Sequence, residues 1–109
     1  MRLMLKVSLP IEPRNSMMKA GTFRPIMGRI LAAIKAEAAY LTTVDGQRAG
    51  IIVVNVDDDD KVPSIAEPLF QAFKASVDIS VAMTAEDLQA ADDDIAQAAK
   101  IYSDTKPTL

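Results

Sequence analysis

The sequence contains neither cysteine nor histidine. Without cysteine the chain has no disulfide, no thiolate nucleophile and no thiolate metal ligand. Without histidine it has no imidazole metal ligand, no axial histidine for a haem and no Ser-His-Asp relay. Any catalysis must therefore use carboxylates, lysines or tyrosines, and we predict neither a cofactor nor a metal.

Long apolar runs are also missing from the sequence. No stretch approaches the roughly 20 apolar residues that span a bilayer, and the first residues lack the charged and apolar segments of a signal peptide. These absences predict a cytoplasmic protein without a membrane partner. Of the 109 residues, 50% are apolar and 25% are charged, which is typical of a folded chain. We predict a single domain over residues 1–102, followed by a flexible tail over 103–109.

The net charge of -3 is unevenly distributed along the chain. Basic side chains dominate residues 1–44, and acidic side chains dominate the remainder. A basic half can mark a site for an anionic ligand or a nucleic acid, here around Arg14, Lys19, Arg24 and Arg29. The alternative is that the basic residues of one element face acidic residues of another. Because only 5% of the residues are aromatic and the overall balance is acidic, we expect no nucleic-acid partner.

Hydrophobic periodicity predicts the elements of the first half. Alternation over residues 2–9 is typical of a strand with one face on a core. We then expect a loop over 15–21, in which Met17, Met18 and Gly21 could form a flexible lid, although we favour plain loop packing. The apolar stripe from Phe23 to Ile34 predicts a helix that begins after Thr22.

A hairpin and two further helices are predicted in the second half. Asp45-Gly46 is a turn signal between a short strand over 39–43 and an apolar strand over 49–56, which should be buried on both faces. The spacing of Ile65, Leu69 and Phe73 predicts a helix that begins near Pro63. A strand over 77–83 and an alanine-rich helix from Thr84 to Tyr102 follow, and this helix should pack at the domain edge or against a partner.

This order of elements predicts an α+β fold. It is the ferredoxin-like βαββαβ sandwich, with a four-stranded antiparallel sheet, both crossover helices on one face and an extra C-terminal helix. The other face would carry Met4, Lys6, Asp78, Ser80 and the unpaired side of the apolar strand. An apolar strand does not leave that face in water, so we predict that two copies pair face to face.

Several short patterns carry a resemblance to a known superfamily. They are Leu9-Pro10, the apolar run from Gly50 to Asp57, Ala66-Glu67-Pro68-Leu69-Phe70, Val77-Asp78-Ile79 and Met83-Thr84-Ala85-Glu86-Asp87-Leu88. With them the chain resembles the dimeric α/β-barrel superfamily, its muconolactone isomerase-like group and small uncharacterised bacterial proteins of that kind. The resemblance implies a homodimeric, cofactor-independent isomerase or cyclase acting on a small organic acid or ketone. The alternative is a non-catalytic small-ligand-binding or assembly module, because the superfamily holds many functions.

The candidate catalytic residues come from strand patterning, and none is carried over from the resemblance. We expect Lys6, Tyr40, Arg48 and Asp78 to project from the sheet face opposite the helices, where a lysine and a carboxylate could exchange protons with a small carbonyl compound. Alternatively, Lys6 and Asp78 simply pair across the sheet. Glu67 is a candidate general base at a pocket mouth, or a solvated surface residue.

The acidic run Asp57–Asp60 is the most visible charge feature of the sequence. It lacks the alternating ligands, central glycine and distal glutamate of a calcium loop. We therefore expect it to be a solvated turn that helps to start the next helix.

Overall fold

The sheet has four antiparallel strands in the order β2-β3-β1-β4. The structure is a computed structural model that describes residues 1–103. Its strands are β1 (Arg2–Ser8), β2 (Ala38–Val44), β3 (Gln47–Asn55) and β4 (Ser76–Ala82). β1 pairs with both β3 and β4. The connection from β1 to β2 therefore passes over β3, the connection from β3 to β4 passes over β1, and both connections carry helices. The predicted ferredoxin-like α+β fold is confirmed.

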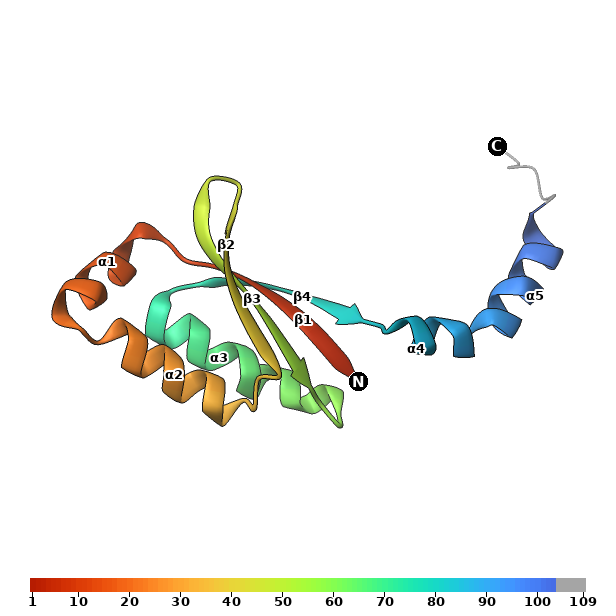
Figure 1. Ribbon diagram of the computed structural model, residues 1–109, viewed down its shortest axis with the longest axis horizontal. Helices are drawn as coiled ribbons and strands as arrows, with labels where there is room; N and C mark the ends of the chain where they lie inside the picture. The colour runs from red at the N-terminus through yellow and green to blue at the C-terminus, as the bar shows by residue number, and fades with distance from the viewer. Residues whose placement is uncertain (104–109) are drawn as a thin grey trace.

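Two crossover helices, α2 (Phe23–Ala33) and α3 (Val62–Phe73), lie side by side on one face of the sheet (Figure 1). A short 3-10 turn, η1 (Asp59–Lys61), leads into α3. The predicted spacing in α3 is confirmed, because Ile65, Leu69 and Phe73 are all buried. Lys74 then ends the helix in a left-handed conformation, with φ of 52°. We call the sheet surface under these helices the helix face and the opposite surface the open face.

The core lies between the helix face and the two crossover helices. Leu5, Leu69 and Phe73 are fully buried there, with 0% of each exposed. Phe73 packs against Phe23 of α2, with ring centroids 5.1 Å apart and ring planes inclined by 50°. The tilted contact is a favourable arrangement for two aromatic rings. Alternation along β1 supplies Leu3, Leu5 and Val7 to this core as the sequence predicts.

One helix replaces a predicted loop. Residues expected to form a loop over 15–21 belong to α1 (Ile11–Ala20), in which Glu12 has a non-helical backbone. Gly21 ends α1 with φ of 73°, and its N–H bonds to the carbonyls of Met17 and Met18. The segment has no buried residue and no clear apolar stripe, so hydrophobic periodicity could not detect it. The prediction of a loop over 15–21 is therefore wrong, whereas Met17 and Met18 do pack against the core.

The prediction that β3 is buried on both faces is correct for only one of them. Ile52 and Val54 are buried on the helix face, with 3% and 0% exposed. Ile51 and Val53 point to the open face and are half-buried, and no helix of residues 1–103 lies over that face (Figure 1). In one copy, no helix of the described part of the chain therefore covers the open face.

Beyond β4 the chain continues as α4 (Ala85–Ala90) and α5 (Asp92–Tyr102), which extend away from the sheet (Figure 1). The predicted single helix is thus two, divided at Ala91. No residue of either helix is buried, so packing at the edge of the same domain is not observed. We call residues 83–103 the C-terminal arm, and it contributes to a longest dimension of 60 Å against 33 and 23 Å.

The division into a domain over 1–102 and a tail over 103–109 stays a prediction. Apart from Ser103, the predicted tail lies outside the described residues. Within the part of the chain that the structure describes, no helix is long and apolar enough to cross a membrane.

Candidate functional site

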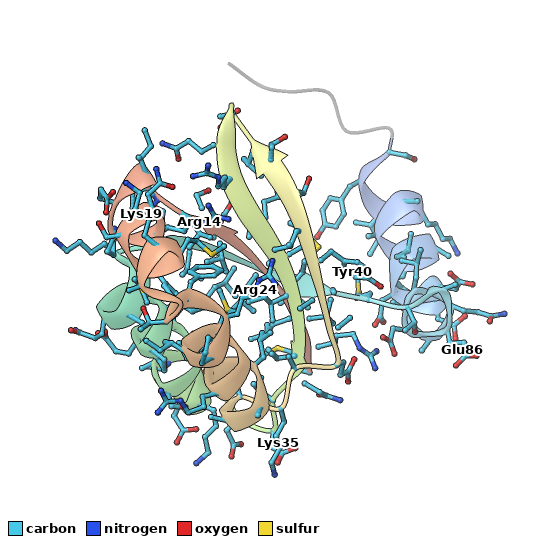
Figure 2. The ribbon with its side chains drawn as sticks, turned by 60° about the vertical axis from the view of Figure 1, so that its left-hand side comes forward. Arg14, Lys19, Arg24, Lys35, Tyr40 and Glu86 are labelled. Atoms are coloured by element: carbon cyan, nitrogen blue, oxygen red, sulfur yellow. The ribbon has the colours of Figure 1, made fainter. Side chains whose placement is uncertain are left out.

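A cavity of 450 Å³ lies between α1, α2 and the β2–β3 hairpin. Three arginines from three elements line it: Arg14 of α1, Arg24 of α2 and Arg48 of β3. We call this cavity the arginine pocket, and Figure 2 labels Arg14 and Arg24 between the helices and the sheet. Its other lining residues are mostly apolar: Leu9, Met18, Phe23, Met27, Gly28, Leu31, Leu41, Thr42 and Ala49.

The core holds Arg14 in place. Its guanidinium carbon lies 5.3 Å from the centroid of the Phe23 ring, in a cation–π arrangement. Phe23 is itself 8% exposed and packs on Phe73, so the arginine rests on a rigid support. The Nε atom of Arg14 is buried and has no hydrogen-bond partner in the structure.

Arg48 is fixed by a neutral partner. Its Nη1 donates a hydrogen bond to Oδ1 of Asn15, at 2.8 Å, and its backbone carbonyl accepts one from the Leu9 N–H, at 2.9 Å. Along β3, Arg48 shares the helix face with Ile52 and Val54, because side chains alternate between faces with a period of two. The prediction that Arg48 projects from the face opposite the helices is therefore wrong.

Within residues 1–103, no carboxylate lines the arginine pocket. Glu12 on α1 accepts hydrogen bonds from the N–H and the Oγ of Ser16, at 3.2 and 2.6 Å. Among residues 1–103, the ion pair that forms joins Arg2 to Glu37, with Nε and Oε2 2.9 Å apart. In the described chain the three arginines of the pocket therefore have no acidic partner.

The other predicted residues form a row on the open face. Lys6 pairs with Ile51 of β3 on one side and with Asp78 of β4 on the other, and Ile51 pairs with Tyr40 of β2. Lys6 and Asp78 are exposed, and no ion pair joins them in the described structure. Tyr40 is labelled on the sheet side away from the crossover helices in Figure 2. Since the row and the arginine pocket lie on opposite faces, their side chains do not form one site.

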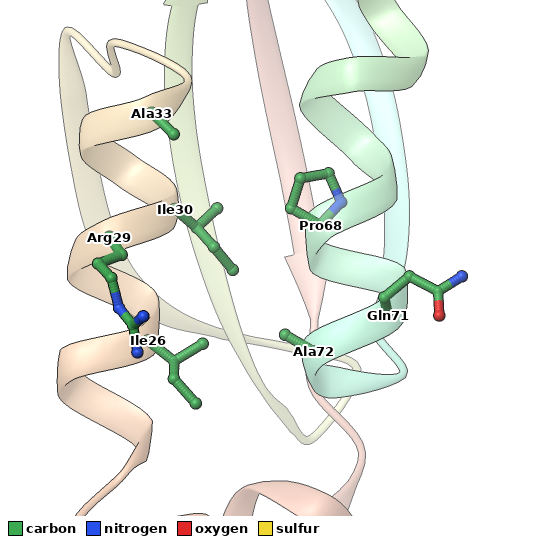
Figure 3. A pocket seen from close by; sticks show the side chains of 7 residues that line it. All are labelled: Ile26, Arg29, Ile30, Ala33, Pro68, Gln71 and Ala72. Carbon is green, nitrogen blue, oxygen red and sulfur yellow. The ribbon is translucent and has the colours of Figure 1, made fainter.

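Glu67 lies outside the arginine pocket. It is exposed on α3, and its Oε2 accepts a hydrogen bond from Nε2 of Gln71, at 3.4 Å. A shallow apolar groove of 540 Å³ runs between α2 and α3 (Figure 3), and Glu67 is not among its lining residues. The role of Glu67 as a general base stays a prediction. The groove is lined by Ile26, Arg29, Ile30, Ala33, Pro68, Gln71 and Ala72.

The acidic run Asp57–Asp60 contributes no residue to the arginine pocket. Asp57–Asp60 are all exposed, and within residues 1–103 no group of three or more histidine, cysteine, aspartate or glutamate side chains could hold a metal ion. Gly28 lines the pocket from the middle of α2, and a Cβ added there would meet no atom within 4 Å. A glycine inside a helix is unfavourable by about 1 kcal/mol relative to alanine, and this could have drawn attention to Gly28 in the sequence.

These elements define a ferredoxin-like α+β sandwich. No family model and no curated protein matches the sequence. Among solved structures, the chain is similar to 5-chloro-2-hydroxyhydroquinone dehydrochlorinase (TftG) from Burkholderia phenoliruptrix AC1100 in complex with 2,5-dihydroxybenzoquinone. That match has a TM-score of 0.57 and 12% identity, and covers 79% of this chain and 97% of the other. At this identity the likeness shows the fold alone.

Two further solved structures match with lower scores. A formyltetrahydrofolate deformylase from Pseudomonas putida KT2440 has a TM-score of 0.46 and 12% identity, over 94% of this chain and 39% of that one. The de novo designed protein Ferredog-Diesel has a TM-score of 0.45 and 8% identity, over 74% and 85%. The expected likeness to the muconolactone isomerase group stays a prediction.

Proposed function

We propose that the chain is a homodimeric, small-molecule-binding protein of the dimeric α/β-barrel type, which holds a small organic acid or ketone in the arginine pocket. The observation that carries the proposal is the pocket itself, where three arginines that have no acidic partner among residues 1–103 meet apolar walls. Its 450 Å³ volume lies within the range of roughly 300–1,000 Å³ typical of small-molecule sites. The structural neighbour TftG, in complex with 2,5-dihydroxybenzoquinone, supports a small organic ligand.

The pocket chemistry favours binding over catalysis. Among the lining residues there is no aspartate, glutamate, lysine or tyrosine. Arginine stays protonated in proteins and so cannot take up a proton as a general base. Thr42 is the one hydroxyl-bearing residue of the lining, and its Oγ1 donates a hydrogen bond to the Thr43 carbonyl rather than to a base. A ligand in this pocket would therefore be held without proton transfer by these side chains.

A second candidate function is a cofactor-independent isomerase or cyclase that uses the open face. The paired positions of Lys6 and Asp78, in one row with Tyr40, favour it. If two open faces pack together, this row is removed from water between two sheets, where a lysine and a carboxylate can act as acid and base. In this version the active site lies at the dimer interface, and the proposed setting is the bacterial cytoplasm.

The homodimer is proposed because the open face is apolar at its centre. Met4, Ile51 and Val53 are only half-buried there, and Tyr40 is 64% exposed. The C-terminal arm adds exposed apolar side chains, with Leu88 48% and Ile95 51% exposed. Apolar side chains exposed on a sheet face favour a protein interface there, and a second copy of the chain presents the same face in return.

The binding function is tested by closing the pocket from within. Because a Cβ at Gly28 meets open space, Gly28→Leu should fill the pocket without disturbing the core, and Gly28→Ala serves as the matched control with little added volume. A panel of small organic acids and ketones is titrated while 15N-labelled amide signals are recorded. We expect panel members to shift signals around the pocket in the parent and alanine proteins, but not in the leucine variant. Failure of the whole panel, or equal binding by the leucine variant, would overturn the proposal.

A further inference from the structure

The electrostatics of the arginine pocket select one class of ligand. Arg14, Arg24 and Arg48 bring three positive charges to a cavity whose walls are otherwise mostly apolar. Arg24 and Arg48 are exposed and Arg14 is half-buried, so apolar surroundings strengthen the interaction with an anion mainly at Arg14, where they lower the local dielectric constant. A neutral ketone would leave all three charges uncompensated.

The guanidinium of Arg14, and not its buried Nε, would offer the anion a fixed partner, because the Nε atom has no exposed surface for a ligand to reach. Buried donors in folded proteins are almost always hydrogen-bonded, and this one has no partner in the structure. Its guanidinium is held on the Phe23 ring, so it cannot turn to water without losing that contact. Arg48 is held by Asn15, whereas Arg24 is exposed and can adjust its position.

The apolar walls favour an organic body over a simple ion. A small adjoining cavity of 50 Å³ shares Leu9, Met27, Leu31 and Leu41 with the arginine pocket and extends towards Ile52. Together the two cavities offer a ligand a charged end at the arginines and an apolar end. Inorganic phosphate could bind at the charged end but would leave the apolar end unfilled.

We infer that the arginine pocket binds the carboxylate of an organic acid with a compact apolar body, and that Arg14 and Arg48 hold the carboxylate oxygens. The planar fork of a guanidinium matches a carboxylate with two parallel hydrogen bonds. The inference rests on the proposed binding function and deepens it, because it names an acid rather than a ketone as the ligand class.

The test compares acids with their neutral amides. Benzoate, 2-methylbutyrate and cyclohexanecarboxylate are each titrated beside the matching amide, with inorganic phosphate as a simple anion, and the Arg Nε–Hε signals are followed by NMR. We expect at least one carboxylate to move the Arg14 signal and to bind about tenfold or more tightly than its amide. Arg14→Met should lose that preference. Arg29→Met, on the groove side of α2, removes the same charge and should keep it.

The contrary results of this test distinguish a failure of the carboxylate inference from a failure of the proposed binding function. If the amides bind as tightly as the acids, or if Arg14→Met binds the acids as well as the parent, the carboxylate inference fails and the broader binding function stands. Phosphate binding equal to the best carboxylate would mean a general anion site and would also overturn it. If no acid and no amide binds, and Gly28→Leu changes nothing, both the inference and the proposed function fail.

Discussion

Lys6 and Asp78 occupy paired positions on β1 and β4, and both side chains stand exposed on the open face of the sheet. The neighbouring positions towards β3 are apolar, since Lys6 also pairs with Ile51, and Met4 pairs with Val53. The open face thus has an apolar centre on β3 and a charged strip towards β4. This asymmetry gives an interface both an apolar contact and a means of setting its orientation.

The first prediction concerns the apolar centre of the open face. Val53→Glu places a charge between Met4 and Ala38, its neighbours across the sheet. We expect light scattering over a dilution series to give a dimer for the parent protein and a monomer for the variant, because a buried unpaired charge opposes the contact. Circular dichroism should show that the variant monomer is folded, since Val53 is only half-buried within one copy.

A matched control for Val53→Glu is Thr43→Glu, which adds the same charge to an exposed position on the helix side of β2, opposite Arg48. It should remain dimeric. A parent protein that is monomeric at every concentration, or a Val53→Glu protein that stays dimeric, would contradict the proposed pairing.

The second prediction uses two phenylalanines of α3. Phe73 is 0% exposed and contacts Phe23, whereas Phe70 is 41% exposed. Phe73→Ala should lower the free energy of unfolding by about 3–5 kcal/mol, because it leaves a cavity in the core. Phe70→Ala should cost about 1 kcal/mol or less, since it buries little apolar surface in one copy. Urea denaturation measures both, and equal losses would mean that the core is wrongly placed.

The third prediction concerns the end of α3. Lys74 has φ of 52°, a left-handed conformation that glycine adopts without steric cost. Lys74→Gly should therefore raise the free energy of unfolding by about 0.5–1 kcal/mol. Gln71→Gly, one turn earlier within the same helix, should lower it by about 1 kcal/mol. Thermal and urea unfolding distinguish the two, and a loss in both variants would contradict the assigned end of α3.

The fourth prediction is a pH dependence of α4. Backbone and side-chain hydrogen bonds with Thr84 lower the pKa of Asp87 below its ordinary value, and Arg2 adds a smaller effect. Thr84 N–H donates to Oδ2 of Asp87 at 3.0 Å, and the Asp87 N–H donates to Oγ1 of Thr84 at 3.1 Å. A lowered folded pKa means that this cap stabilises α4 above the ordinary aspartate pKa and is lost as the pH falls through the lowered value.

Helical 13Cα shifts of residues 85–90 should therefore decrease on acidification from about pH 6 to about pH 2. In Asp87→Asn the dependence should be much smaller, with a remainder from Glu86 in the same turn. An unchanged pH profile in that variant would show that Asp87 does not control the start of α4.

The fold could be predicted from the sequence where the buried residues of a single strand or helix follow the periodicity of that element. Alternation at Leu3, Leu5 and Val7, and the four-residue spacing of Ile65, Leu69 and Phe73, each report burial within a single strand or helix. α1 escaped prediction because its residues bury no continuous stripe. Its C-terminal end is instead fixed by the Gly21 backbone and by contacts of Met17 and Met18 with the core.

The arginine pocket could not be predicted because its three arginines come from three elements. In the sequence, Arg14 and Arg24 are recognisable only as basic charge, and nothing local to Arg14 indicates that Phe23 supports it. The predicted face for Arg48 is wrong, although counting back in steps of two from Ile52 gives the correct face. The row of Lys6, Tyr40 and Asp78 was placed together from strand patterning, while its chemistry stays a prediction.

The C-terminal arm increases the radius of gyration of the molecule. The Cα radius of gyration is 18.5 Å, against about 13 Å for a compact domain of this length. An arm that folds onto any surface would shorten the particle, and one that stays extended would slow its tumbling and diffusion. Small-angle X-ray scattering on unlabelled protein therefore reports where the arm lies, before any ligand or interface is known.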